Sequence, residues 1–152
     1  MFEYSADGSL LWVSNSQQFQ ILDTANQTVL KQVQYPNIGA ISFSPSGKFF
    51  VTWEKPTPEK PNENLIIWST STAEPLLKLN QKQISSDNWP VIRWSDDDSV
   101  AYRLFKDEVV FYNAPKFSEN KLRIEHLSGV QLSPGPLATL KGKMTLCCHG
   151  NR

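Results

Sequence analysis

Short segments of alternating apolar and polar residues recur along this chain, and each is followed by a serine and turn-forming residues. These segments are FEYSADG at 2–8, ISFSPSG at 41–47, IRWSDDD at 92–98 and VQLSPGP at 130–136. A period of two is typical of β-strands, and no long window keeps the i, i+3, i+4, i+7 spacing of a helix. The pattern therefore predicts strands separated by tight turns, and no helix.

The residues that follow each serine turn repeat as well. Two strands joined by a polar connection come next, and the second of them is predicted to end at Leu22-Asp23, Trp68-Ser69 and Tyr112-Asn113. A further apolar stretch completes each unit, at Thr28–Val33, Pro75–Leu79 and Lys121–His126. The middle unit is longer because of the segment EKPTPEKPNEN, whose prolines and charges are unsuited to the interior of a sheet. We therefore expect Pro56 to Asn64 to form an exposed loop.

Four short β-rich segments per unit of about 40–45 residues are typical of a β-propeller blade. The predicted fold class is all-β: a partial WD-repeat-like β-propeller of about three four-stranded antiparallel blades. Residues 1–136 are assigned to it, with blades near 2–34, 40–80 and 91–127 and the start of a fourth at 129–136. Residues 137–152 are predicted to be a divergent, disordered tail. Propellers need about four to eight blades, so this ring is expected not to close.

Three stretches resemble a known family: 43–69 (FSPSGKFFVTWEKPTPEKPNENLIIWS), 88–113 (NWPVIRWSDDDSVAYRLFKDEVVFYN) and 120–136 (NKLRIEHLSGVQLSPGP). In order and spacing they look like successive parts of the N-terminal propeller of the eukaryotic translation initiation factor 2A family. The resemblance covers roughly residues 1–136, and the large propeller subunit of initiation factor 3 is a weaker match. Family members carry a segment before the position of Phe2, further strands after Pro136 and a C-terminal region. The chain is therefore expected to be a truncated or spliced product, or a partial gene model.

The resemblance implies a role in translation initiation. The intact family delivers or stabilises initiator methionyl-tRNA on the small ribosomal subunit and contacts mRNA, and the propeller is expected to dock proteins and the ribosome through its loops. The partners implied for the full-length parent are thus the small ribosomal subunit, initiator tRNA and mRNA. The alternative is a WD-repeat scaffold for protein–protein interaction without a role in translation. Neither interpretation makes the chain an enzyme.

Composition narrows these possibilities. The chain has 15 Lys and Arg against 15 Asp and Glu, which argues against nucleic-acid binding driven by bulk charge. It has no apolar run of about 18 residues and no signal-peptide pattern, so a cytoplasmic location and no membrane contact are expected. Its two cysteines, Cys147 and Cys148, are adjacent and cannot build a disulfide framework.

Candidate sites for chemistry are few. Asp96, Asp97 and Asp98 lack the spaced ligands and later Glu of a calcium loop, so we interpret them as a solvated β-turn. Cys147, Cys148 and His149 do not supply the spaced ligands of a zinc site, and His126 lacks a partner for general-base catalysis. Phosphate-loop, dinucleotide-binding and nucleophile-elbow motifs are also missing. No catalytic, cofactor-binding or metal-binding residue is therefore predicted, and no cofactor.

Aromatic and basic residues are the remaining candidates for a contact role. Trp53, Trp68 and Trp94 fall within strand patterns, which favours core packing over base stacking. Trp89 precedes its strand and is the candidate for an exposed contact at a propeller rim. Four lysines stand among acidic residues and therefore form no continuous row of cations for phosphate contacts. They are Lys55, Lys60, Lys78 and Lys82.

Overall fold

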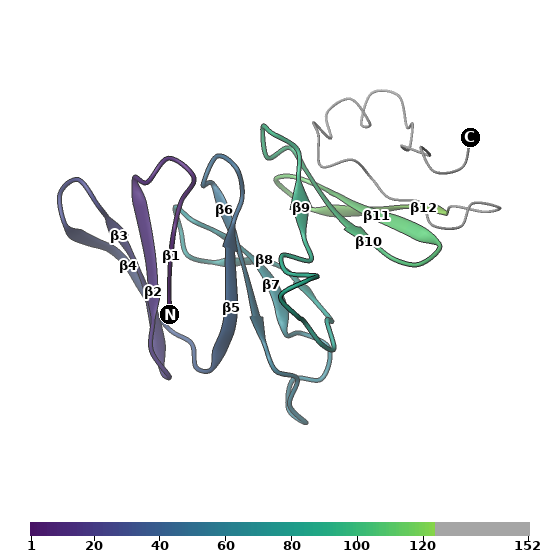
Figure 1. Cartoon of the computed structure of the whole chain (residues 1–152), viewed down its shortest axis with the longest axis horizontal. Coiled ribbons are helices and arrows are strands. Elements are labelled where there is room, and N and C mark those ends of the chain that lie inside the picture. Colours follow the sequence, from purple (N-terminus) through teal and green to yellow (C-terminus); the bar gives the residue numbers. More distant parts are fainter. Residues whose placement is uncertain (124–152) are drawn as a thin grey trace. The chain divides into compact units, whose positions relative to one another are not determined.

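The computed structural model describes residues 1–123, which form twelve strands in three antiparallel sheets of four strands each (Figure 1). The first sheet contains β1 (Phe2–Tyr4), β2 (Leu10–Ser14), β3 (Gln18–Asp23) and β4 (Thr28–Gln34). The second contains β5 (Ile38–Phe43), β6 (Phe49–Glu54), β7 (Leu65–Ser69) and β8 (Pro75–Leu79). The third contains β9 (Arg93–Trp94), β10 (Val100–Leu104), β11 (Glu108–Asn113) and β12 (Ser118–Arg123).

Each sheet pairs its strands in chain order, and residues 1–123 contain no helix. The all-β fold class, with its unclosed four-stranded antiparallel blades, is therefore confirmed. The first two sheets form one compact unit, Met1–Pro90, and the third belongs to a second unit that begins at Val91. The predicted start of a fourth blade at 129–136 and the predicted tail at 137–152 lie outside the described residues.

Strand ends follow the sequence pattern closely at most positions. β3, β7 and β11 end at Asp23, Ser69 and Asn113, the residues expected from the repeat. Two strands begin earlier than expected. β5 begins at Ile38, where a β-bulge separates Ile38 from the regular ladder. β12 begins at Ser118, because a tight turn with a hydrogen bond from the N–H of Phe117 to the carbonyl of Asn113 brings the chain back at once.

The repeated serines close the same hairpin turn in every sheet. Each hydroxyl accepts a hydrogen bond from the backbone N–H five residues later, at the start of the next strand. The donor and acceptor pairs are Leu10 and Ser5 at 3.0 Å, Phe49 and Ser44 at 3.0 Å, and Val100 and Ser95 at 3.1 Å. All three serines are buried. A buried hydroxyl that satisfies a turn explains why this residue type recurs at this position.

A stack of aromatic rings forms the core between the first and second sheets. Trp12 stacks on Phe19 at 5.5 Å between ring centroids, and Phe50 stacks on Trp68 at 5.8 Å. Phe19 and Trp68 pack edge to face at 5.3 Å between ring centroids, which links the two pairs. Trp68 is only 2% exposed and its indole N–H donates to Thr52 Oγ1 at 2.8 Å. The prediction that Trp68 belongs to the core is therefore confirmed.

The third sheet has aromatic pairs of its own. Trp94 and Phe117 pack edge to face at 5.9 Å, and Tyr102 lies 6.3 Å from Phe111, both measured between ring centroids. Burial raises the pKa of the Tyr102 and Tyr112 hydroxyls. These neutral phenols provide large apolar area within the sheet.

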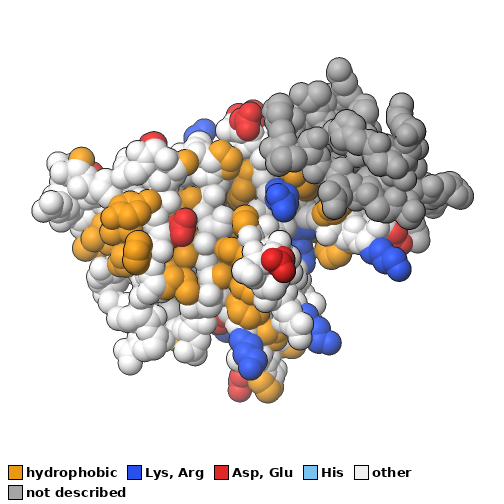
Figure 2. Space-filling model, viewed as in Figure 1, with side chains coloured by type: hydrophobic (Ala, Val, Ile, Leu, Met, Phe, Trp, Pro, Cys, Tyr) orange, Lys and Arg blue, Asp and Glu red, His pale blue; other side chains and the backbone are white. Residues whose placement is uncertain are grey.

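The face of the first sheet that points away from the aromatic core is open. Its side chains are those that alternate with Trp12 along β2 and with Ile21 along β3, and none of them is charged. Phe2 and Tyr4 are 67% and 53% exposed, and Figure 2 shows apolar side chains gathered over the first sheet. Farther across this face, glutamines pair between β3 and β4 at 2.8 Å, Gln20 with Gln32 and Gln34 with Gln18. The outer face is thus apolar at the β1 side, and at the β4 side it combines these glutamines with the exposed Val29.

Candidate functional site

A groove lies between the first and second sheets, at the end of the first unit where the serine turns lie. Its cavity volume is about 450 Å³, within the size range of ligand pockets of roughly 300–1,000 Å³. Leu10, Leu30 and Lys31 come from the first sheet. The second sheet contributes residues of its two turns at this end, which are Ser46, Gly47, Lys48, Thr70 and Ser71.

Backbone geometry fixes both sides of this groove. Gly47 has a φ of 79°, which the turn after Ser44 requires and which favours glycine. The N–H of Thr70 donates to the carbonyl of Lys48 at 3.0 Å and ties the two turns of the second sheet together. On the opposite side, the register of β3 and β4 shifts by a β-bulge, so that Lys31 pairs with Ile21 and Val29 pairs with Leu22, leaving Leu30 off the ladder. Bulges redirect side chains in this way.

The groove is locally cationic. Lys31 and Lys48 are both exposed, and neither forms an ion pair with a residue in the described range. Among residues 1–123, no Asp or Glu lines the cavity. Thr70 is 8% exposed, and its hydroxyl makes no hydrogen bond within residues 1–123. The groove therefore combines two ammonium groups, several hydroxyls and two leucines.

A second cluster joins the Pro-rich segment to the sheet beneath it. The Tyr35 hydroxyl donates a hydrogen bond to Glu54 Oε1, and Lys60 Nζ lies 4.0 Å from the same oxygen. The ammonium of Lys60 also lies 4.5 Å from the centroid of the Tyr35 ring. Burial, and then the hydrogen bond and charge of Glu54, raise the pKa of Tyr35 well above its usual range. This cluster ties the loop to the sheet through Lys60 and keeps the Tyr35 phenol neutral near neutral pH.

The prediction that Pro56 to Asn64 is an exposed loop holds for most of the segment but is wrong at Asn64. That residue is 1% exposed. Its Nδ2 donates to the carbonyls of Glu54 at 2.9 Å and Gln81 at 2.7 Å, and its Oδ1 accepts from the N–H of Gln81 at 3.0 Å. A buried side-chain amide can satisfy the backbone at the base of a loop, which the polarity of the segment alone does not reveal.

The acidic triplet is a turn, as the sequence predicted, but one of its members is buried. Asp97 Oδ1 accepts hydrogen bonds from the N–H of Ser99 at 3.0 Å and from the hydroxyls of Ser95 and Ser99. Asp98 is 1% exposed with a φ of 61°, where the other two turns have glycine, so it is not the solvated residue expected. Within residues 1–123 no His, Cys, Asp or Glu group of three or more is arranged to hold a metal ion. His126, Cys147, Cys148 and His149 lie outside the described residues.

The tryptophans differ in burial. Trp12 is fully buried, while Trp53 is half-buried and donates from Nε1 to the carbonyl of Gln81 at 2.8 Å. Trp89 is half-buried rather than exposed, and its Nε1 donates to the carbonyl of Ile41 at 3.3 Å. Trp89 was a candidate for an exposed contact at the rim, and this hydrogen bond instead holds its ring against β5.

Sequence reasoning missed Lys31 and Lys48. They stand 17 positions apart in the chain, in different repeats, and neither lies in a motif. Only the packing of the first sheet against the turns of the second brings them to one cavity. The lysines that the sequence singled out lie elsewhere, and of these Lys60 takes part in the cluster with Tyr35 and Glu54.

Comparisons with known proteins agree with the fold. Eukaryotic translation initiation factor 2A of Dictyostelium discoideum is 36% identical over 135 residues, which cover 87% of this chain and 22% of that protein. The same factor of Schizosaccharomyces pombe is 34% identical over 138 residues, covering 87% and 23%. A component of eukaryotic translation initiation factor 3 of Lodderomyces elongisporus is 24% identical over 152 residues, covering 85% and 21%. No family model matches the chain.

Solved structures give the same result. A crystal structure of a eukaryotic initiation factor matches with a TM-score of 0.72 and 32% identity, covering 89% of this chain and 34% of that one. Hydrazine synthase of Kuenenia stuttgartiensis matches with a TM-score of 0.52 and 18% identity, over 88% and 38% of the two chains, and shows the fold alone.

Blade-like sheets in consecutive order, together with these similarities, place the chain in the class of translation initiation factor propellers. Within that class it is a relative of eukaryotic translation initiation factor 2A, and the resemblance predicted from the sequence is confirmed. The chain spans about a fifth of the length of the curated relatives it matches. Among the described residues, no helix is long and apolar enough to cross a membrane.

Proposed function

We propose that this chain is the part of a translation initiation factor that serves as a docking platform while the longer protein delivers initiator methionyl-tRNA to the small ribosomal subunit. The observation that carries this proposal is the 36% identity to eukaryotic translation initiation factor 2A over 135 residues. The longer protein contacts tRNA and mRNA, and this segment contacts protein or ribosomal surfaces through its turns. The role is non-enzymatic and cytoplasmic.

The character of the described residues supports docking over catalysis. The groove at the serine turns presents ammonium groups, hydroxyls and aliphatic side chains on rigid hairpins. A general acid or base needs a partner positioned within hydrogen-bond reach of a reacting group, whereas the carboxylate–phenol contact between Glu54 and Tyr35 fastens a loop. Binding surfaces commonly lie on loops that a rigid scaffold positions.

Co-sedimentation with purified small ribosomal subunits tests the proposal. The full-length parent is centrifuged through a sucrose cushion with small subunits, with large subunits and alone, at low and at high salt. We expect the protein to pellet with small subunits at low salt, and labelled initiator tRNA to pellet with it. A parent that stays in the supernatant under all conditions would support a WD-repeat scaffold without a role in translation.

A further inference from the structure

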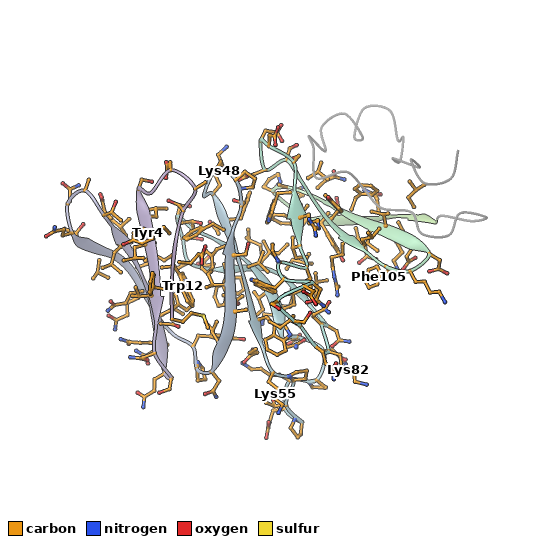
Figure 3. All side chains as sticks on the ribbon, in the orientation of Figure 1. Tyr4, Trp12, Lys48, Lys55, Lys82 and Phe105 are labelled. Atoms are coloured by element: carbon orange, nitrogen blue, oxygen red, sulfur yellow. The ribbon has the colours of Figure 1, made fainter. Side chains whose placement is uncertain are left out.

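The groove between the first two sheets has two chemically distinct sides. Leu10 and Leu30 give it an aliphatic surface, and Leu30 is 49% exposed although it is a large apolar residue. Lys31 follows Leu30 directly, and Lys48 approaches from the second sheet (Figure 3 labels Lys48). The β-bulge at Leu30 is what brings an aliphatic and a cationic side chain of one edge strand to the same cavity.

The charges of this groove are complementary to an acidic ligand. Two exposed lysines line it, no carboxylate does, and neither lysine is neutralised by an ion pair within residues 1–123. The chain as a whole has a formal net charge of zero, so this is a local concentration of positive charge. Local potentials of this kind select and orient charged partners.

Thr70 adds a hydrogen-bonding group at the same place. Its hydroxyl is buried without a partner in the described chain, and buried polar groups normally have one. Because Thr70 also lines the groove, this hydroxyl is a candidate donor to a ligand bound there. Peptide carbonyl and carboxylate oxygens are acceptors that such a donor would satisfy.

We propose that this groove binds an acidic peptide segment of a partner protein, with a leucine-sized side chain on Leu10 and Leu30 and a carboxylate between Lys31 and Lys48. The inference rests on the proposed docking role and names the chemistry of the partner. RNA fits the groove less well, because single-stranded binding sites stack bases on aromatic rings and none of the described residues that line the cavity is aromatic. An aliphatic contact beside paired ammonium groups suits a peptide.

A biosensor assay with the full chain tests this proposal. The chain is immobilised at low density, so that molecules do not meet, and the probe is a pool of ten-residue peptides in which Asp or Glu alternates with Leu or Ile. We expect the double variant Lys31→Glu/Lys48→Glu to weaken binding at least about tenfold, since each charge-assisted contact is lost and replaced by repulsion. Pools with Asn or Gln in place of the acids, or with Ser in place of Leu and Ile, should bind correspondingly less.

The matched control is Lys55→Glu/Lys82→Glu. It changes the net charge equally, at exposed lysines on the end of the second sheet opposite to Lys48 (Figure 3). We expect it to change binding by less than about twofold, as surface charges outside a contact contribute little. Thr70→Val should weaken binding without lowering the thermal midpoint, because the lost hydroxyl has no partner within the described chain. Unchanged circular dichroism of all variants shows that they fold.

Four results would overturn the inference: no binding of the acidic pool, equal binding of the neutral pool, equal loss in the control variant, or tighter binding of a twelve-nucleotide oligouridine through the same lysines. The last would make the groove a nucleic-acid site. The assay contains no ribosome, so it separates this inference from the proposed function. If the parent does not co-sediment with small subunits but the chain still binds the acidic peptides, only the proposed function is overturned.

Discussion

Individual residues in this chain act mainly in two ways. Some form hydrogen bonds with the backbone of the turns, and others fill the space between the sheets. The serine at each hairpin accepts a hydrogen bond from the next strand, and the residue three positions later takes a left-handed conformation. The aromatic stack from Trp12 to Trp68 then fills the interior of the first unit. Changes at these two kinds of position should act on stability, and changes at the groove should act on binding.

Trp68→Ala should lower the free energy of unfolding of an intact propeller by about 3–5 kcal/mol, because it leaves a cavity against Phe19 and Phe50. Chemical denaturation followed by circular dichroism measures the loss. Trp68→Phe is the control, since it keeps an aromatic ring in the stack and gives up the hydrogen bond to Thr52. A loss below about 1 kcal/mol for the alanine variant would mean that the ring is not part of the core.

Gly47→Ala should cost about 1 kcal/mol of unfolding free energy, because a φ of 79° is unfavourable for a residue with a Cβ. The added Cβ would lie 3.6 Å from that of Ser5, an ordinary contact, so the cost is conformational. Gly47→Asn should recover part of the loss, since Asn tolerates this conformation better. Equal stability of the alanine variant and the parent would contradict the assigned turn.

The hydroxyl of Tyr35 should make stability fall in alkaline solution. Its pKa is raised in the folded chain, above the usual value of 10.0, first by burial and then by Glu54. The folded state therefore holds this proton more tightly than the unfolded state, so the stabilisation is present below pH 10 and is lost as the pH rises toward the folded pKa. Tyr35→Phe should flatten this decline in denaturation curves from pH 8 upward, while Tyr102 and Tyr112 serve as a constant background. An unchanged slope would contradict the assignment.

The sequence predicted the positions of individual strands better than any larger feature of the structure. Ser5, Ser44 and Ser95 fixed the register, and the ends of β3, β7 and β11 followed from it, because alternation and turn chemistry are local. Asn64, Trp89 and the groove depend on contacts between segments far apart in the chain, such as Asn64 with Gln81 and Trp89 with Ile41. Local patterns contain no information on those contacts, so the candidate site required the structure.

Limited proteolysis examines the Pro-rich loop. Lys55 and Lys60 both precede proline, so a glutamate-specific protease is the suitable probe. We expect the first cut after Glu59, which is exposed, and protection after Glu63, because the next residue, Asn64, is buried and hydrogen-bonded. Lys60→Ala should speed the first cut by releasing the loop from Glu54, and Lys55→Ala should leave its rate unchanged. Cleavage within β6 or β7 before the loop would contradict this order.

The molecule as a whole leaves one face of its first sheet open. Phe2 and Tyr4 are exposed on this face, and Figure 2 shows apolar side chains gathered over the first sheet. Exposed apolar patches of this kind usually mark a partner or a tendency to associate. Since each propeller blade is covered by its neighbours, the same face would be covered in a closed ring.

Residues 1–152 expressed alone should therefore self-associate and unfold at a lower temperature than a full propeller. Sedimentation velocity over a range of concentrations measures the first, and differential scanning calorimetry the second. Phe2→Ser/Tyr4→Ser should shift the chain toward the monomer, whereas Lys55→Ser, a change on an exposed loop, should not. A monodisperse parent monomer with a sharp cooperative transition would contradict this expectation.

The pairing of every strand with its neighbour in sequence also bears on how the chain folds during its own synthesis. Each described sheet is formed by a single continuous stretch of chain, and none needs a strand from a later repeat. A hairpin forms in about 1–10 µs, whereas a ribosome adds about 5–20 residues per second. A blade can thus assemble within milliseconds of leaving the exit tunnel and offer its aromatic face to the next one as that emerges. Propeller growth would then proceed vectorially, from the N-terminus, with the serine turns as the first native contacts.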